Sequence, residues 1–134
     1  MIRPMKPTDR HAVRALQGSL EYHDPDLVDA ALDGPFLGSV ATEGTSPVGY
    51  AIGFPGDPIT LSELAVTPAC RRRGHGRALV DAIASMGDGS IVVHTPAENQ
   101  AAQQFYTAMG FERHEYRPGF YDDGSDALGF TRRE

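Results

Sequence analysis

Residues 61 to 79 read Leu61-Ser62-Glu63-Leu64-Ala65-Val66-Thr67-Pro68-Ala69-Cys70-Arg71-Arg72-Arg73-Gly74-His75-Gly76-Arg77-Ala78-Leu79, and they predict both a local structure and a ligand. The apolar residues up to Val66 predict a strand, and the apolar spacing after Gly74 predicts a helix. Four arginines lie between these elements or just inside the helix. Such a loop directs free backbone N–H groups toward one point, and the positive end of the helix dipole adds to the arginine charge. The stretch therefore predicts a binding site for a phosphate or pyrophosphate group.

The composition is that of one acidic domain over residues 1–134. The formal net charge of -6 argues against non-specific nucleic-acid binding, which needs a positive surface. The single cysteine, Cys70, excludes an internal disulfide, and the five histidines show no metal-ligand spacing, so we expect no metal. No apolar run reaches the roughly 18 residues of a membrane span, and no apolar signal segment follows the N-terminus. We therefore expect a cytoplasmic protein that binds neither nucleic acid nor a membrane.

The expected elements alternate between strands and helices, which favours an α/β or α+β sheet of mixed direction. Turn residues and hydrophobic periodicity place the boundaries. In chain order the elements are a strand over 1–5, a helix begun by Thr8 and stopped by Gly18, a helix over 24–34, strands over 36–41, 48–54 and 59–66, a helix over 74–86, a strand over 90–95, a helix over 99–109, and a strand pair over 111–116 and 127–131.

Two common nucleotide-binding loops are excluded by single residues. The dinucleotide fingerprint needs a third glycine where this chain has Leu79, and the P-loop needs Gly-Lys-Ser/Thr where it has Gly76-Arg77-Ala78. The spacing Arg71-x-x-Gly74-x-Gly76 instead resembles the pyrophosphate loop of the GCN5-related N-acetyltransferases (GNAT), the acetyl-CoA-dependent family. The preceding Leu64-Ala65-Val66-Thr67-Pro68 is similar to the central strand and proline turn of that family.

A second motif, Asn99-x-x-Ala102-x-x-x-Tyr106-x-x-x-Gly110-Phe111, also resembles this family. One helix and one strand fit between it and Gly76. The resemblance covers about residues 2–131, with the first 55 residues matching only in pattern. It implies an α/β (α+β) fold with a mixed, mostly antiparallel central sheet of six to seven strands, flanked by about four helices. A single GNAT acetyltransferase domain is therefore expected over the whole chain.

The C-terminal residues are similar to one branch of the family. The pattern Arg117-x-x-Phe120-Tyr121-x-x-Gly124-x-Asp126-Ala127-Leu128 resembles the tail of the RimI/Ard1-like enzymes, which acetylate protein N-termini. Phe120 stands where that branch often has tyrosine, and Phe130 stands where methionine is common. A hairpin with an aromatic turn is the purely structural interpretation. The resemblance implies that the acceptor is a peptide or protein N-terminus, and the alternative is a small metabolite amine such as a polyamine, amino acid or amino sugar.

The resemblance implies that acetyl-CoA binds as a co-substrate along the central strand and the loop, with no metal. Strand backbone would pair with the pantetheine arm like an added strand, and loop amides would hold the pyrophosphate. The residues implied in this binding are Leu64, Ala65, Val66, Arg71, Arg72, Arg73, Gly74, His75, Gly76, Arg77, Asn99 and Tyr106.

Direct acetyl transfer needs an acid for the leaving thiolate and a base for the attacking ammonium. The resemblance implies Tyr106 as the acid, because a phenol with a pKa of about 10 stays protonated at neutral pH. Core packing is the alternative role. His94 stands five residues before Asn99, where the RimI-like branch usually has glutamate, and it is either the base or a buried structural histidine. Glu63, acting through water, is the rival base, and it points opposite to Leu64 unless a bulge intervenes.

The acceptor is expected to meet Tyr22, His94 and Tyr121, which the family layout places across from acetyl-CoA. A CoA-binding module without catalysis is a third functional interpretation. The missing branch glutamate favours it, whereas Asn99 and Tyr106 argue against it. The oligomeric state stays open between a monomer and a homodimer.

Overall fold

The computed structural model describes residues 1–20, 23–24 and 26–133. Within these residues the chain forms seven strands and four α-helices. The strands are β1 (Ile2–Pro4), β2 (Leu37–Glu43), β3 (Ser46–Phe54), β4 (Ile59–Val66), β5 (Ile91–Pro96), β6 (Glu112–Arg117) and β7 (Ala127–Arg132). The helices are α1 (Arg10–Gln17), α2 (Asp26–Asp33), α3 (His75–Ala84) and α4 (Gln100–Ala108). In the described part of the chain, the helices are all too short or too polar to cross a bilayer.

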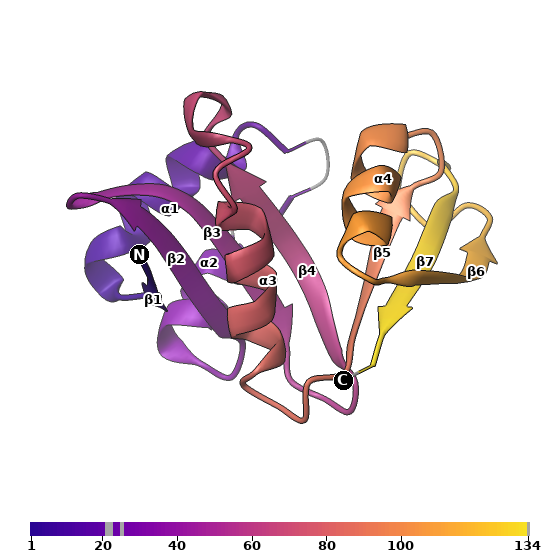
Figure 1. Cartoon of the computed structure of the whole chain (residues 1–134), viewed down its shortest axis with the longest axis horizontal. Coiled ribbons are helices and arrows are strands. Elements are labelled where there is room, and N and C mark those ends of the chain that lie inside the picture. Colours follow the sequence, from indigo (N-terminus) through magenta and orange to yellow (C-terminus); the bar gives the residue numbers. More distant parts are fainter. Residues whose placement is uncertain (21–22, 25, 134) are drawn as a thin grey trace.

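The strands form one sheet in the order β1-β2-β3-β4-β5-β7-β6. Neighbouring strands are antiparallel except β4 and β5, which run parallel. Their pairing covers 59–61 and 91–93, after which the two strands diverge toward their carboxyl ends (Figure 1). This confirms the predicted fold, a mixed and mostly antiparallel sheet flanked by helices. Because β4 and β5 diverge, residues 62–66 of β4 and 94–96 of β5 do not pair with each other, and the facing edges of the two strands are open.

Two separate cores cover the two faces of the sheet. One core joins α1 and α2 to the sheet and includes Val13, Val28, Val40, Tyr50 and Ile52. The other joins α3 and α4 to the opposite face and includes Leu79, Ile83, Ile91, Tyr106, Phe111 and Phe130. The apolar stripes at helical spacing in α3 and α4 therefore bury against the sheet, as their periodicity predicts.

A bulge in β4 determines which face each of its side chains meets. Ile52 pairs with Glu63 and Gly53 pairs with Leu61, so Ser62 is an additional residue on β4. Leu61 packs in the core beneath α3, whereas Glu63 points to the α1 face, where Tyr50 also lies. Leu64 again packs against the core beneath α3. Glu63 therefore does point opposite to Leu64, and the bulge lies just before it.

Two predicted boundaries are wrong. The first α-helix begins at Arg10, after a 3₁₀ turn over Pro7–Asp9, and Thr8 is not its cap. The carboxylate of Asp9 determines this geometry, because it accepts hydrogen bonds from the Lys6 amide and from the Arg3 guanidinium. The turn between β2 and β3 is also tighter than predicted, since β2 extends to Glu43.

Candidate active site

The loop after β4 has the backbone of an anion-binding site. Gly74 is the N-cap of α3 and has a φ of 83°, and Arg72 has a φ of 64°. Residues with side chains rarely adopt this left-handed region, so a glycine suits position 74. The first amides of α3 have no acceptor within the helix, and they face the end of the loop. The backbone therefore presents N–H donors where the sequence predicts a phosphate.

Contacts to the protein hold the basic side chains of this loop. Arg71 Nε donates to the Val66 carbonyl at 3.0 Å, and Arg77 Nη2 donates to the Ala108 carbonyl at 3.2 Å. Glu43, at the end of β2, binds Arg73 Nη1 at 2.5 Å and His75 Nε2 at 2.7 Å. The hydrogen bonds from His75 and Arg73 lower the pKa of Glu43 below its usual value. Glu43 therefore clamps the loop, a role that local sequence did not indicate.

The two glycines of the loop serve different purposes. At Gly74 a Cβ would meet open space, so the requirement there is conformational. At Gly76 a Cβ would lie 2.9 Å from Phe105 Cζ, so this glycine lets α3 approach α4 closely. Gly74 therefore serves the backbone conformation of the loop, and Gly76 serves the packing of two helices.

A groove of about 780 Å³ runs from this loop along β4 to α4, and we call it the loop groove. Ten of the predicted cofactor-binding residues line it, namely Leu64, Ala65, Val66, Arg71, Arg72, Gly74, His75, Gly76, Arg77 and Tyr106. Arg73 and Asn99 are not part of its lining. Arg73 turns instead to Glu43, and Asn99 lies at a second cavity.

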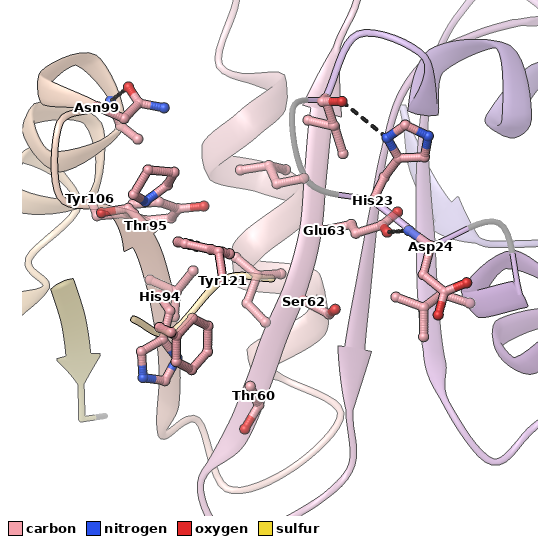
Figure 2. A pocket seen from close by; sticks show the side chains of 18 of the residues that line it. His23, Asp24, Thr60, Ser62, Glu63, His94, Thr95, Asn99, Tyr106 and Tyr121 are labelled. Carbon is pink, nitrogen blue, oxygen red and sulfur yellow. Dashed lines mark hydrogen bonds between the residues drawn. The ribbon is translucent and has the colours of Figure 1, made fainter. Parts of the chain in front are cut away.

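The second cavity, of about 380 Å³, occupies the space where β4 and β5 diverge, and we call it the splay cavity. His94, Tyr121, Glu63 and Tyr106 all line it (Figure 2). Tyr22 lies outside the described residues, but His23 and Asp24 from the same segment line this cavity. Four residues line both cavities, namely Leu20, Leu64, Ala102 and Tyr106. The structure thus brings the two predicted sites together at Tyr106.

Tyr106 packs in the core and also lines both cavities. Its ring lies 5.1 Å from Phe105 and 5.2 Å from Phe111, in edge-to-face contacts, and its side chain is buried. Burial, together with the nearby Tyr121, raises the pKa of the phenol well above its ordinary value. The hydroxyl therefore stays protonated at neutral pH, at the junction of the loop groove and the splay cavity.

Asn99 begins α4 at the mouth of the splay cavity. Its side-chain oxygen accepts a hydrogen bond from the Ala102 amide at 3.0 Å, as an N-cap does. The oxygen is thus committed to the helix, and a contact with a ligand would use the side-chain NH₂ group. The asparagine of the second motif has a structural reason in addition to the predicted binding role.

Glu63 is enclosed by hydrogen-bond donors. Its Oε1 accepts from Tyr50 Oη at 2.9 Å and from Gln17 Nε2 at 2.8 Å, and its Oε2 accepts from the Asp24 amide at 2.9 Å. Glu63 is 4% exposed. Burial, followed by the effect of this carboxylate, strongly raises the pKa of Tyr50, so the phenol remains a donor. The carboxylate joins β4 to α1 and to the segment before α2.

His94 has a different environment on the opposite wall of the splay cavity. Its Nε2 lies 2.7 Å from Oε1 of Glu115 on β6, and its side chain is 18% exposed. The ring of Phe120 stacks on the imidazole, with 4.7 Å between centroids and 19° between planes. The hydrogen bond with His94 is the main cause that lowers the pKa of Glu115. Sequence reasoning missed Glu115, which lies 21 residues away along the chain.

Two further groups complete the site. Thr95 Oγ1, on the wall of the splay cavity, is buried without a hydrogen-bond partner among the described residues. Cys70 is a free, half-buried thiol that lines the loop groove. In the ranges 1–20, 23–24 and 26–133, the side chains of His, Cys, Asp and Glu form no group of three that suits a metal ion.

Comparison with known proteins decides the family. The family model described as an acetyltransferase (GNAT) domain matches residues 36–113, more than half of the chain. The chain belongs to the GNAT family of acetyltransferases. The matched region includes β4, the arginine-rich loop and α4. The predicted family, one of acetyltransferases, is confirmed.

Curated relatives of this GNAT chain include much longer proteins. The mycothiol acetyltransferase of Clavibacter michiganensis subsp. michiganensis is 39% identical over 82 residues, which are 60% of this chain and 27% of the relative. The mycothiol acetyltransferase of Clavibacter sepedonicus is 35% identical over 102 residues, 75% of this chain and 34% of the relative. The chain therefore spans about a third or less of the length of these relatives.

One solved structure with a similar fold over nearly the whole chain is Ard1 from Thermoplasma volcanium, with 28% identity and a TM-score of 0.83, covering 98% of this chain and 95% of that one. The ribosomal-protein-S18-alanine N-acetyltransferase from Escherichia coli has 25% identity and a TM-score of 0.81, covering 98% and 91%. The resemblance of this GNAT chain to the RimI/Ard1-like branch is thereby confirmed.

Proposed function

We propose that this GNAT chain transfers the acetyl group of acetyl-CoA to a primary amine, the N-terminus of a peptide or protein, by direct attack in a ternary complex. The observation that carries the proposal is the junction of the loop groove and the splay cavity at Tyr106. Two ligands bound in these cavities would meet at a buried phenol. His94 lines the wall of the splay cavity on β5.

Successive parts of the loop groove suit successive parts of acetyl-CoA. Amides at the start of α3 and the charges of Arg71, Arg72 and Arg77 suit the pyrophosphate. The diverging edge of β4 at Leu64 and Val66 suits an extended chain that carries amides, such as pantetheine. When bound, acetyl-CoA supplies a thioester that an amine nitrogen can attack.

The residues of the splay cavity provide the two proton transfers. Nε2 of His94 faces Glu115, so Nδ1 is the nitrogen that accepts a proton from the acceptor ammonium. Tyr106 donates its proton to the leaving sulfur, because its raised pKa keeps the phenol protonated until that charge develops. Glu63 takes no proton in this scheme, since protonation would weaken the buried hydrogen bonds that it accepts from Tyr50, Gln17 and the Asp24 amide.

A peptide acceptor is supported by one of the structural relatives reported above. The name of the Escherichia coli enzyme gives an alanine of a ribosomal protein as its acceptor. Phe120 and Tyr121 line the splay cavity, where a peptide end would lie.

A small amine is the second candidate, and the curated relatives favour it. Two of them are named mycothiol acetyltransferases. The splay cavity, at about 380 Å³, is large enough for a small acceptor.

The first experiment measures acetyl transfer from acetyl-CoA to a mixed panel by mass spectrometry. The panel holds peptides with free N-termini, N-blocked lysine peptides and small amines. We expect acetylation at peptide N-termini. Labelling of small amines alone would replace the peptide acceptor by the second candidate. Binding of acetyl-CoA without transfer to any class would contradict the proposed function and favour a module that only binds.

Variants at Tyr106 and in the loop test which residues serve catalysis and which serve acetyl-CoA binding. Tyr106→Phe should lower kcat by roughly tenfold or more while calorimetry shows unchanged acetyl-CoA affinity. Tyr116→Phe, on exposed β6 outside both cavities, is the matched control. Arg72→Glu should weaken acetyl-CoA binding, and Arg113→Glu should not. Gly76→Glu is less informative, because it would also displace Phe105.

A further inference from the structure

We propose that Glu115 is a positioning residue that holds His94 in the one tautomer and orientation able to accept the proton of the acceptor amine. The proposal rests on the proposed function, and it adds a residue that neither family motif contains. Three features of the C-terminal strands support it. They are the alignment of residues across β5, β7 and β6, a bulge in β6, and a glycine in β7.

The two side chains lie in one row across three strands. His94 on β5 pairs with Gly129 on β7, and Glu115 on β6 pairs with the same Gly129 from the other side. Residues directly opposite each other in a sheet project to the same face. His94 and Glu115 therefore share a face, with one strand between them.

A bulge at His114 turns Glu115 to this face. Arg113 pairs with Phe130 and Glu115 pairs with Gly129, so His114 is an additional residue on β6. If the pairing continued from Arg113 without a register shift, His114 would oppose Gly129, and Glu115 would oppose Leu128 and project to the opposite face. The register shift at His114 therefore allows the contact.

Gly129 leaves the space through which Glu115 crosses β7. A Cβ at position 129 would lie 2.6 Å from Glu115 Cγ and 3.0 Å from Oε1. Gly129 does not have a positive φ, so the requirement is space and not backbone conformation. This explains a glycine in the buried part of β7, between Leu128 and Phe130.

Neighbouring groups restrain the pair further. Phe120 stacks on the imidazole, and the Arg117 guanidinium lies 5.3 Å from the Phe120 ring. His114 Nε2 and Arg117 Nη1 each lie 3.9 Å from Glu115 Oε1. The titratable groups that face His94 across the splay cavity are Tyr106 and Tyr121, with Glu63, His23 and Asp24 on the far wall.

The arrangement has a defined consequence for proton transfer. A Nε2–H donated to the Glu115 carboxylate leaves Nδ1 unprotonated. In the reaction, an N–H bond of the acceptor ammonium breaks, its electron pair stays on nitrogen, and a Nδ1–H bond forms. The imidazolium then carries its positive charge beside a carboxylate, which stabilises it.

Glu115→Gln tests the role of the carboxylate, with Glu112→Gln on the same exposed strand as the matched control. We expect Glu115→Gln to lower kcat/KM at least tenfold at neutral pH, with acetyl-CoA affinity unchanged. Glu115→Asp should restore part of the activity. A kcat/KM of Glu115→Gln equal to that of Glu112→Gln, in an enzyme that needs His94, would overturn the proposal.

NMR of the histidine side-chain nitrogens tests the pair without any activity. We expect His94 to be protonated at Nε2 in the wild type and in Glu112→Gln, and to become a tautomer mixture in Glu115→Gln. Gly129→Ala should produce the same mixture by displacing Glu115. An unchanged tautomer in Glu115→Gln overturns the positioning role even if acetyl transfer is observed. Absence of transfer with the expected tautomers would instead count against the proposed function alone.

Discussion

The strands that diverge at the splay cavity present their ionisable groups in opposite ways. On β4, Glu63 is 4% exposed and accepts three hydrogen bonds from Tyr50, Gln17 and the Asp24 amide. On β5, His94 is 18% exposed on its side chain and has a carboxylate on Nε2 and an aromatic ring against its face. Both residues line the same cavity.

The difference separates a group that holds structure from one that can exchange a proton. Protonating Glu63 would weaken several buried hydrogen bonds at once, and removing such partners is costly in a low-dielectric interior. Protonating His94 at Nδ1 would disturb none of the contacts described for it, and it would strengthen the pairing with Glu115. In the proposed function, the same cavity therefore has a structural wall on β4 and a reactive wall on β5.

The largest expected effect comes from His94→Gln. Loss of a general base lowers kcat/KM by roughly 10² to 10⁴-fold, and the free energy of unfolding should change little because the side chain is partly exposed. Steady-state kinetics and urea unfolding measure the two quantities. Near-normal kcat/KM would remove His94 from the mechanism and reopen the comparison in favour of β4.

Glu63→Ala should have the opposite effect, a large loss of stability with the acidic limb of kcat/KM unchanged. It leaves the Tyr50 hydroxyl, the Gln17 amide and the Asp24 N–H without their acceptor, so stability should fall by about 3 kcal/mol. Urea unfolding measures the loss. In the surviving folded protein the acidic limb of kcat/KM should stay in place, and its disappearance would identify Glu63 as the base.

Tyr50→Phe should give a smaller loss, about 2 kcal/mol at neutral pH, since one of three donors to a carboxylate is removed. Its pH dependence has a definite sign. Burial raises the pKa of Tyr50 in the folded state, so its contribution is present below the ordinary tyrosine pKa of about 10 and is lost as pH rises above that value. Stability measured from pH 9 to 12 should therefore fall less steeply in Tyr50→Phe than in the wild type. Equal slopes would contradict the burial of this phenol beside Glu63.

The smallest effect is expected from Glu43→Gln, which releases Arg73 and His75 at the loop without touching either wall of the splay cavity. The Arg73 side chain is 54% exposed, and exposed ion pairs contribute about 1 kcal/mol or less. The KM for acetyl-CoA should therefore rise only about threefold, with kcat unchanged. A change in kcat would show that the contacts of Glu43 with the loop also affect the reacting groups.

Much of the site was predictable because its signals are local. The strand, arginine-rich loop and helix around Gly74 follow from spacing within 19 residues, and the motif from Asn99 to Phe111 is as compact. Both predict the loop groove that the structure contains. The contact between Arg73 and Glu43 was not predictable, because Glu43 is 30 residues away and lies at the end of β2.

By itself, the sequence determined the family, the order of strands and helices, and the residues from which an acid and a base are chosen, because these depend on periodicity and on motifs along the chain. Only the tertiary structure shows that the two candidate bases have different surroundings, hydrogen-bond donors around Glu63 and a carboxylate with a stacked ring beside His94. A bulge before Glu63 and another at His114 determine which face each side chain meets. Gly129 then lets Glu115 reach His94 across β7. Such contacts depend on strand register between distant segments, and a shift of one residue reverses the face of a side chain without changing the local pattern.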